Sequence, residues 1–154
     1  MSDYKVTFET VEAHPMAGVT ARASHAELGT AIMAGLDKVY GVLRAEAPGP
    51  LGCNVVLYGP GWGGKMDLRI GVRLDAPYAG NGMVKGYEIP GGDVAHVVYF
   101  GEYARMHPAH QAAQKAALDS GRGLTGASWE VYGDWSDDPA KLRTDIYYQL
   151  GEAK

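Results

Sequence analysis

The chain has 154 residues, of which 46% are hydrophobic and 21% charged, a composition typical of one globular domain with its own core. Its formal net charge is −4 and it has no Lys/Arg cluster, which argues against direct nucleic-acid binding. One cysteine excludes an intrachain disulfide, and no apolar run is long enough for a membrane span or a secretory leader. We therefore expect a single cytoplasmic domain over residues 1–154, with no membrane segment.

The first half of the chain has the pattern of two strands, a helix and a hairpin. The expected elements are a strand at 5–12, an extended piece at 17–23, a helix at 28–43, and a hairpin formed by 54–59 and 66–74. His14-Pro15 is expected to interrupt the first two strands. Ser24, with Glu27 three residues later, forms a capping-box pattern that predicts where the helix begins.

The same order of elements recurs after a linker at 76–82. The expected elements of the second half are strands at 83–89 and 94–100, a helix at 105–120, and strands at 128–135 and 142–150. The sequence therefore predicts an α+β fold with antiparallel sheet, in which two repeats at 5–75 and 83–150 each have the order strand–strand–helix–strand–strand. A pocket is expected at the pseudo-two-fold seam, because pockets favour such interfaces.

Four motifs of the second half resemble the GyrI-like, or bacterial effector-binding, family. They are Ile89-Pro90-Gly91-Gly92, Gly101-Glu102-Tyr103, Glu130-Val131-Tyr132 and Thr144-Asp145-Ile146-Tyr147. Their order and spacing match the family across 83–150, whereas the first half matches only in general layout. The resemblance implies two tandem duplicated strand–helix–strand–strand modules with a pocket between them. In this pocket a buried glutamate and aromatic residues would bind lipophilic cations. Other family members resemble hydrolases of cyclopropane-bearing toxins, and one branch protects DNA gyrase.

The resemblance also implies roles for three residues. The family's glutamate falls on Glu130, and the acidic residue of its terminal strand falls on Asp145, which is shorter than the usual glutamate. The aromatic residue of that strand falls on Tyr147. The family's proline after this motif is replaced, since the chain continues as Tyr148-Gln149-Leu150.

Strand parity indicates which side chains can meet. Asp145 and Tyr147 share one face of the last strand, while Ile146 lies on the other face with the apolar set that a helix should cover. Glu130 and Tyr132 share a face of the preceding strand. If they point inward, two carboxylates and two tyrosines converge. A carboxylate walled by aromatic rings is costly unless paired, and a bound organic cation relieves that cost through Coulomb and cation–π attraction.

Three aromatic residues of the first half complete the candidate ligand site. Tyr58 aligns with Tyr132 between the two repeats, and Tyr40 lies on the predicted helix, where a core position is the alternative. Trp62 lies in a glycine-rich loop, where it is either a lid over the pocket or a cover for the end of the hairpin.

The histidines give no metal signature. His107 and His110 are three residues apart on the predicted helix, but a metal site needs further ligands. His96 is interpreted as a structural residue on a strand. We expect no metal and no cofactor.

The leading hypothesis is a small-molecule-binding protein for a lipophilic or aromatic cation, acting as a sensor or sequestering domain without turnover. The alternative from another class is a hydrolase of strained electrophiles, with Glu130 as general base and Tyr147 or Tyr132 as proton donor. A third hypothesis is a gyrase- or toxin-protection protein. A homodimer is left open, because sheet edges must be paired or protected.

Overall fold

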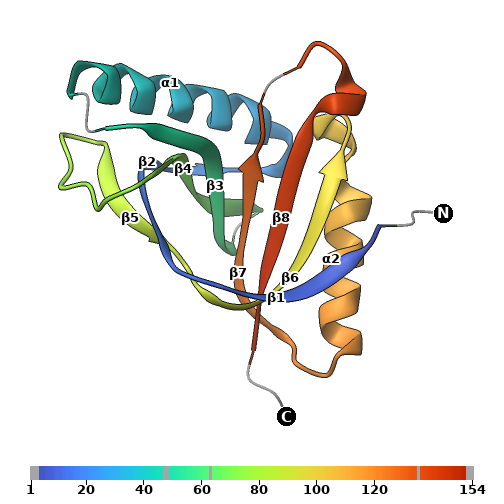
Figure 1. Cartoon of the computed structure of the whole chain (residues 1–154). Coiled ribbons are helices and arrows are strands. Elements are labelled where there is room, and N and C mark those ends of the chain that lie inside the picture. The colour runs from blue at the N-terminus through green and yellow to red at the C-terminus, as the bar shows by residue number, and fades with distance from the viewer. Residues whose placement is uncertain (1–3, 47–48, 63, 135, 152–154) are drawn as a thin grey trace. The chain divides into compact units, whose positions relative to one another are not determined.

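The computed structural model describes residues 4–46, 49–62, 64–134 and 136–151 (Figure 1). The chain divides into two compact units, unit 1 comprising Met1–Glu12 with Gly91–Lys154 and unit 2 comprising Ala13–Pro90. Within the described residues each unit has one long helix and four strands that pair antiparallel. The predicted α+β class with antiparallel strands is confirmed. Across the part of the chain that is described, no helix has the length and apolarity required to cross a membrane.

Unit 2 is a continuous stretch of chain with the strand order β3-β4-β2-β5. Its elements are β2 (His14–Ala23), a 3-10 turn (His25–Glu27), α1 (Leu28–Glu46), β3 (Leu51–Trp62), β4 (Lys65–Leu74) and β5 (Lys85–Ile89). Helix α1 buries Gly35, Val39 and Leu43. A Cβ atom at Gly35 would come within 3.0 Å of the Ile70 side chain, so this glycine lets α1 pack closely onto β4.

The predicted start of the first helix is confirmed. The Ser24 hydroxyl accepts a hydrogen bond from the Glu27 backbone N–H at 3.3 Å, and the Ser24 N–H donates to the Glu27 carboxylate at 2.9 Å. This capping box opens the 3-10 turn that leads into α1.

The predicted interruption at His14-Pro15 is wrong, since both residues belong to β2. They pair with β5, whereas pairing of β2 with β4 begins only at Met16. Pro15 therefore has a partner strand on one side alone, a position where a sheet tolerates proline.

Unit 1 has the strand order β1-β6-β8-β7. Its elements are β1 (Val6–Val11), β6 (Gly92–Phe100), a 3-10 turn (Tyr103–Arg105), α2 (His107–Asp119), β7 (Leu124–Tyr132), a 3-10 turn (Pro139–Lys141) and β8 (Arg143–Leu150). Figure 1 shows α2 running along β6 and β8. Helix α2 buries Ala109 and Ala113 against Val97 and Ile146, and Ala117 against Ala95 and Leu150. These small side chains let the helix pack closely on the sheet.

The strands are grouped differently from the two sequence repeats. Strand β1, at the start of the chain, pairs with β6, and β5 pairs with β2. In both units a strand, a helix and a hairpin follow one another in sequence, and an additional edge strand comes from the other half of the chain.

Candidate functional site

The register between β7 and β8 decides which predicted site residues share a face of unit 1. Glu130 pairs with Ile146, and Val131 pairs with Asp145. Paired residues of an antiparallel ladder lie on the same face. Glu130 therefore lies with Ile146 on the face that α2 covers, called here the helix face. Asp145 lies on the opposite face, called the far face.

The expected convergence of two carboxylates and two tyrosines is wrong. Glu130 and Tyr132 lie on the helix face, and Asp145 and Tyr147 lie on the far face. The apolar Trp129, which is 2% exposed, takes the far face of β7. The charged residue of β7 is accommodated on the helix face because α2 supplies it with a hydrogen-bond partner, His110.

Glu130 is the centre of the helix-face cluster, formed by His110, Gln114, Glu130, Tyr132 and Tyr148. Its side chain is almost fully buried, and the whole residue is 5% exposed. The Tyr132 hydroxyl donates a short hydrogen bond to Glu130 Oε1. His110 Nε2 lies 2.6 Å from Glu130 Oε2. Hydrogen bonds to both oxygens favour the ionised carboxylate.

The hydrogen-bond chain continues on the other side of the imidazole. His110 Nδ1 lies 2.6 Å from the Tyr148 hydroxyl, which also accepts a hydrogen bond of 3.2 Å from the Gln114 amide. The two rings meet edge to face, with centroids 5.6 Å apart. Burial, followed by the nearby Glu130 charge, raises the pKa of Tyr148 to about 12. Tyr148 therefore stays protonated at neutral pH and can act as a donor.

Two further residues, Tyr103 of the 3-10 turn and Thr144 of β8, are neighbours of Tyr132 in this cluster. Tyr103 is 43% exposed, and its ring meets that of Tyr132 edge to face at 5.5 Å. Thr144, the cross-strand neighbour of Tyr132, is fully buried, and its hydroxyl has no hydrogen-bond partner among the described residues. The neighbourhood of Glu130 thus combines aromatic rings with a polar group that is still unsatisfied.

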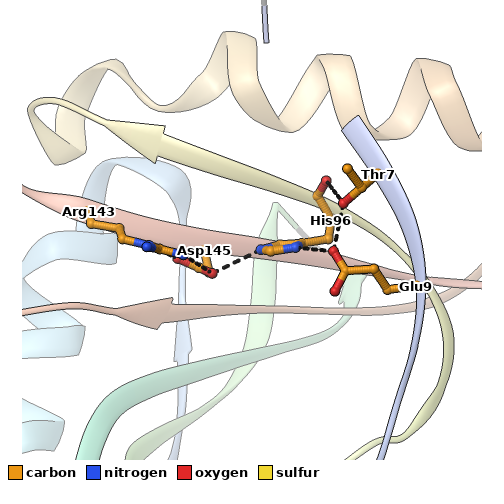
Figure 2. Close-up of polar contacts among 5 residues, drawn as sticks. All are labelled: Thr7, Glu9, His96, Arg143 and Asp145. Carbon is orange, nitrogen blue, oxygen red and sulfur yellow. Dashed lines mark hydrogen bonds and ion pairs between the residues drawn. The ribbon is translucent and has the colours of Figure 1, made fainter. Parts of the chain in front are cut away.

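The far-face cluster is centred on His96, on β6 (Figure 2). His96 Nδ1 lies 2.5 Å from the Glu9 carboxylate of β1, and Nε2 lies 2.9 Å from the Asp145 carboxylate of β8. The Thr7 hydroxyl donates to Glu9 at 2.6 Å. The Arg143 guanidinium donates to both oxygens of Asp145, at 2.7 and 3.1 Å.

This arrangement requires a positively charged imidazole. Ionised carboxylates only accept hydrogen bonds, so both ring nitrogens of His96 must donate. The hydrogen bond to Asp145 raises the pKa of His96, burial opposes that rise, and the hydrogen bond to Glu9 adds to it. Burial alone would raise the pKa of Asp145, but hydrogen bonds from His96 and Arg143 outweigh it and lower that pKa to about 2.

A row of stacked rings extends from His96 across the far face. The imidazole is stacked on Tyr147, with centroids 4.4 Å apart and an interplanar angle of 2°. Tyr147 is stacked in turn on Trp129 at 5.6 Å and 15°. An imidazolium on aromatic rings between two carboxylates provides the chemistry that was predicted for a bound organic cation, but here the protein's own side chain supplies the charge.

The remaining predicted residues belong to unit 2. The Tyr40 hydroxyl on α1 donates to the Asn54 side chain of β3 at 2.5 Å, and burial raises the pKa of Tyr40. Tyr58 is half-buried on β3, where it pairs with Leu68. Trp62 is the last residue of β3, and its side chain lies outside the described part of the structure.

Two other features of the described residues do not coincide with the predicted site. No group of three or more His, Cys, Asp and Glu side chains in this part of the chain has a geometry that could hold a metal ion. An open groove of about 470 Å³ lies between α2 and the start of β1, and none of the predicted site residues lines it.

Sequence reasoning did not assign a functional contact to His110. The spacing of His107 and His110 was considered only as a possible pair of metal ligands. In the structure His107 is exposed, whereas His110 contacts Glu130 of the sheet. Its partners lie 20 and 38 residues further along the chain. The position of His110 one residue after the buried Ala109 and three before the buried Ala113 was the available signal that it lies near the buried side of α2.

The whole fold matches solved structures. The C-terminal domain of EcmrR aligns over 99% of this chain and 100% of that chain, with 18% identity and a TM-score of 0.80. SAV2435 bound to tetraphenylphosphonium aligns over 97% and 94%, with 15% identity and a TM-score of 0.63. A hydrolase from Listeria innocua aligns over 96% and 92%, with 10% identity and a TM-score of 0.63. No protein-family model and no curated protein matches the chain.

At these identities the structural matches establish the fold alone. The chain shares the fold of these proteins over nearly its whole length, in agreement with the fold that the four sequence motifs implied. The motif residues Glu130 and Tyr132 are brought together in that fold, and so are Asp145 and Tyr147, but the two pairs lie on opposite faces of β7 and β8.

Proposed function

We propose that this chain binds a lipophilic aromatic cation through Glu130, acting as a sensor or sequestering protein. The observation that carries the proposal is a carboxylate that is only 5% exposed and held by a tyrosine hydroxyl and an imidazole. Burying a carboxylate costs several kcal/mol of desolvation free energy. A ligand cation offsets part of this cost, so the site favours positive charge.

Aromatic neighbours support an organic cation over a simple metal ion. The Tyr132 ring carries the hydroxyl that contacts Glu130, and the partly exposed Tyr103 packs on Tyr132. The negative faces of such rings attract cations spread over a large apolar surface.

The structural comparison supports the same ligand class. SAV2435, which has this fold, is bound to tetraphenylphosphonium, a cation surrounded by four aromatic rings. Tetraphenylphosphonium is therefore a suitable first probe for this chain. Its charge does not depend on pH, so any pH dependence of binding comes from the protein.

The test is a calorimetric titration with tetraphenylphosphonium of the unmodified chain, Glu130→Gln and Glu102→Gln. Glu102 is an exposed carboxylate of the same unit and serves as the matched control. We expect Kd of about micromolar order for the unmodified chain and for Glu102→Gln. Glu130→Gln should bind at least roughly tenfold more weakly, because a buried charge pair is lost. Equal affinity of Glu130→Gln and the unmodified chain would overturn the proposal, as would no binding by any of the three.

A hydrolase is the second candidate, favoured by one observation. The Glu130 carboxylate lies 2.6 Å from an imidazole and also contacts a tyrosine hydroxyl, which is an arrangement suited to general acid–base chemistry. Tyr132 is the donor that contacts Glu130, whereas Tyr147 lies on the far face. Product formation from a strained electrophile, retained binding and lost turnover in Glu130→Gln would establish this function instead.

A further inference from the structure

We propose that His110 sets the charge specificity of the Glu130 site: as a neutral imidazole it keeps the carboxylate ionised and oriented, and once protonated it competes with a cationic ligand. This inference rests on the proposed function. His110 is a positioning residue, which affects the affinity for a cationic ligand through its hydrogen bond to Glu130. It is carried by the hydrogen-bond chain from Gln114 through Tyr148 and His110 to Glu130.

The hydrogen positions along this chain follow from donor and acceptor chemistry. An ionised Glu130 accepts only, so the proton of His110 is on Nε2, which lies 2.6 Å from it. Nδ1 is then free to accept from the Tyr148 hydroxyl, whose oxygen accepts from the Gln114 amide. With a neutral imidazole, each donor in this hydrogen-bond chain has an acceptor. Tyr148 is a suitable donor because its pKa is about 12.

A second proton on His110 would disturb this order. Nδ1–H would become a donor, and the Tyr148 hydroxyl hydrogen would lose its acceptor. The imidazolium would also place a positive charge 2.6 Å from the carboxylate that the ligand needs. The ligand and the proton therefore compete for the same negative charge, and linkage requires that each weaken the binding of the other.

Among the described residues, the titratable groups on the elements packed against α2 can be named one by one. Glu130 on β7 and Tyr148 on β8 contact His110 directly, and the Tyr132 hydroxyl of β7 contacts Glu130. Tyr99 on β6 also faces the helix, and its hydroxyl donates to a backbone carbonyl. Tyr4 lies before β1 against the same core. His107, on α2 itself, is exposed and serves as the matched control.

The first measurement is the Kd of tetraphenylphosphonium over a series from about pH 8 to about pH 5. For the unmodified chain and His107→Gln we expect affinity to fall with decreasing pH, by up to about tenfold per pH unit once His110 is protonated. His110→Gln, whose amide can still donate to Glu130, should show no slope in this range. A slope that persists unchanged in His110→Gln, or no slope in the unmodified chain, overturns the inference.

A second measurement needs no ligand. Long-range ¹H–¹⁵N NMR spectra of the imidazoles should show His110 at neutral pH with a proton on Nε2 and none on Nδ1. An imidazolium, or the Nδ1–H tautomer, overturns the assignment. Absence of tetraphenylphosphonium binding in every variant would overturn the proposed function and the specificity role with it. Binding with an unaltered pH slope in His110→Gln would overturn the specificity role alone.

Discussion

His96 and His110 contact opposite faces of β8 and have different neighbours. His96 lies between two carboxylates, those of Glu9 and Asp145, and must donate from both ring nitrogens. His110 faces one carboxylate and one hydroxyl, and a single donated proton is enough. The far face therefore contains its own cation, while a neutral donor orients the carboxylate on the helix face. The partners of the ring, and not the residue type, therefore decide whether a histidine neutralises a carboxylate or only orients it.

This difference also separates the two halves of the predicted site. Asp145 and Tyr147 already hold the His96 imidazolium and the Arg143 guanidinium. Glu130 is the member of the predicted pair that we propose for the ligand. Loss of the histidine of either cluster should cost the most stability, and loss of the Tyr148 hydroxyl the least.

The largest effect is expected from replacing each histidine by leucine. His96→Leu removes a donor shared by two carboxylates and should lower the free energy of unfolding by about 2–3 kcal/mol. His110→Leu removes a donor from the nearly buried Glu130 carboxylate and should cost about as much, about 2–3 kcal/mol. Urea unfolding of the two variants measures both costs. A cost below about 1 kcal/mol for either variant would contradict the stabilising role given to its hydrogen bonds.

The next effect is the pH dependence of stability that the far-face cluster contributes. The pKa of His96 is raised, so its contribution is present below ~6.5 and is lost as the pH rises through the higher folded value. The pKa of Asp145 is lowered to about 2, so its contribution is lost as the pH falls from ~3.8 towards 2. Thermal unfolding should give a Tm that falls by a few degrees on both sides of this window.

Variants of the same cluster show which residue causes the fall of Tm at acid pH (the acid limb) and at alkaline pH (the alkaline limb). His96→Gln should flatten the alkaline limb, and Asp145→Asn should flatten the acid limb and reduce the alkaline one, because it removes a partner of His96. The matched variant His110→Gln should leave the alkaline limb as it is. An alkaline limb that survives in His96→Gln would contradict the assignment of the imidazolium.

A smaller effect is expected from the stack of His96 on Tyr147. A double-mutant cycle with His96→Leu and Tyr147→Leu should give a coupling free energy of about 1 kcal/mol, as expected for a cation stacked on an aromatic ring. Unfolding by urea of the two single variants and the double variant provides the four values of the cycle. A coupling free energy indistinguishable from zero would show that the stacking of the two rings does not contribute to stability.

The smallest effect is expected from Tyr148. Tyr148→Phe removes the hydroxyl between His110 and Gln114 and should cost about 1 kcal/mol or less. Because the pKa of Tyr148 is about 12, the difference in phenolate absorbance between the unmodified chain and this variant should develop near that pH rather than near 10. A difference that develops at the ordinary pKa of tyrosine would place the hydroxyl in water.

The fold was largely predictable because its signals are local. The capping box at Ser24 and Glu27, the apolar stripe of the first helix and the alternation of β4 each depend on residues within a few positions of one another. The start of β2 at His14 was not predicted. Pro15 is tolerated in a strand only where one neighbouring strand is absent, and the sequence does not show which neighbours β2 has at that position.

The site was only partly predictable because its contacts are not local. Strand parity correctly placed Asp145 with Tyr147 on one face of β8, and Glu130 with Tyr132 on one face of β7. It could not predict which face of β7 is continuous with which face of β8. The apolar Trp129 and Val131 favoured the opposite orientation for β7, and the polar side chain is accepted beside α2 only because His110 contacts it there. Both ring nitrogens of His96 have partners, as its interpretation as a satisfied strand residue required, but the sequence could not identify these carboxylates, which lie 87 and 49 residues away.

The pairing of β1 with β6 has a consequence for the order in which the chain acquires structure. Val6 pairs with Val97, so the first strand must remain without this partner until the chain has been synthesised well beyond its middle. Unit 2 is a continuous stretch, Ala13–Pro90, and all its strands are available earlier. Since contacts distant in sequence close late and slow folding, we expect unit 2 to become protected from proteases first during translation. The N-terminal segment should be the last to lose its sensitivity.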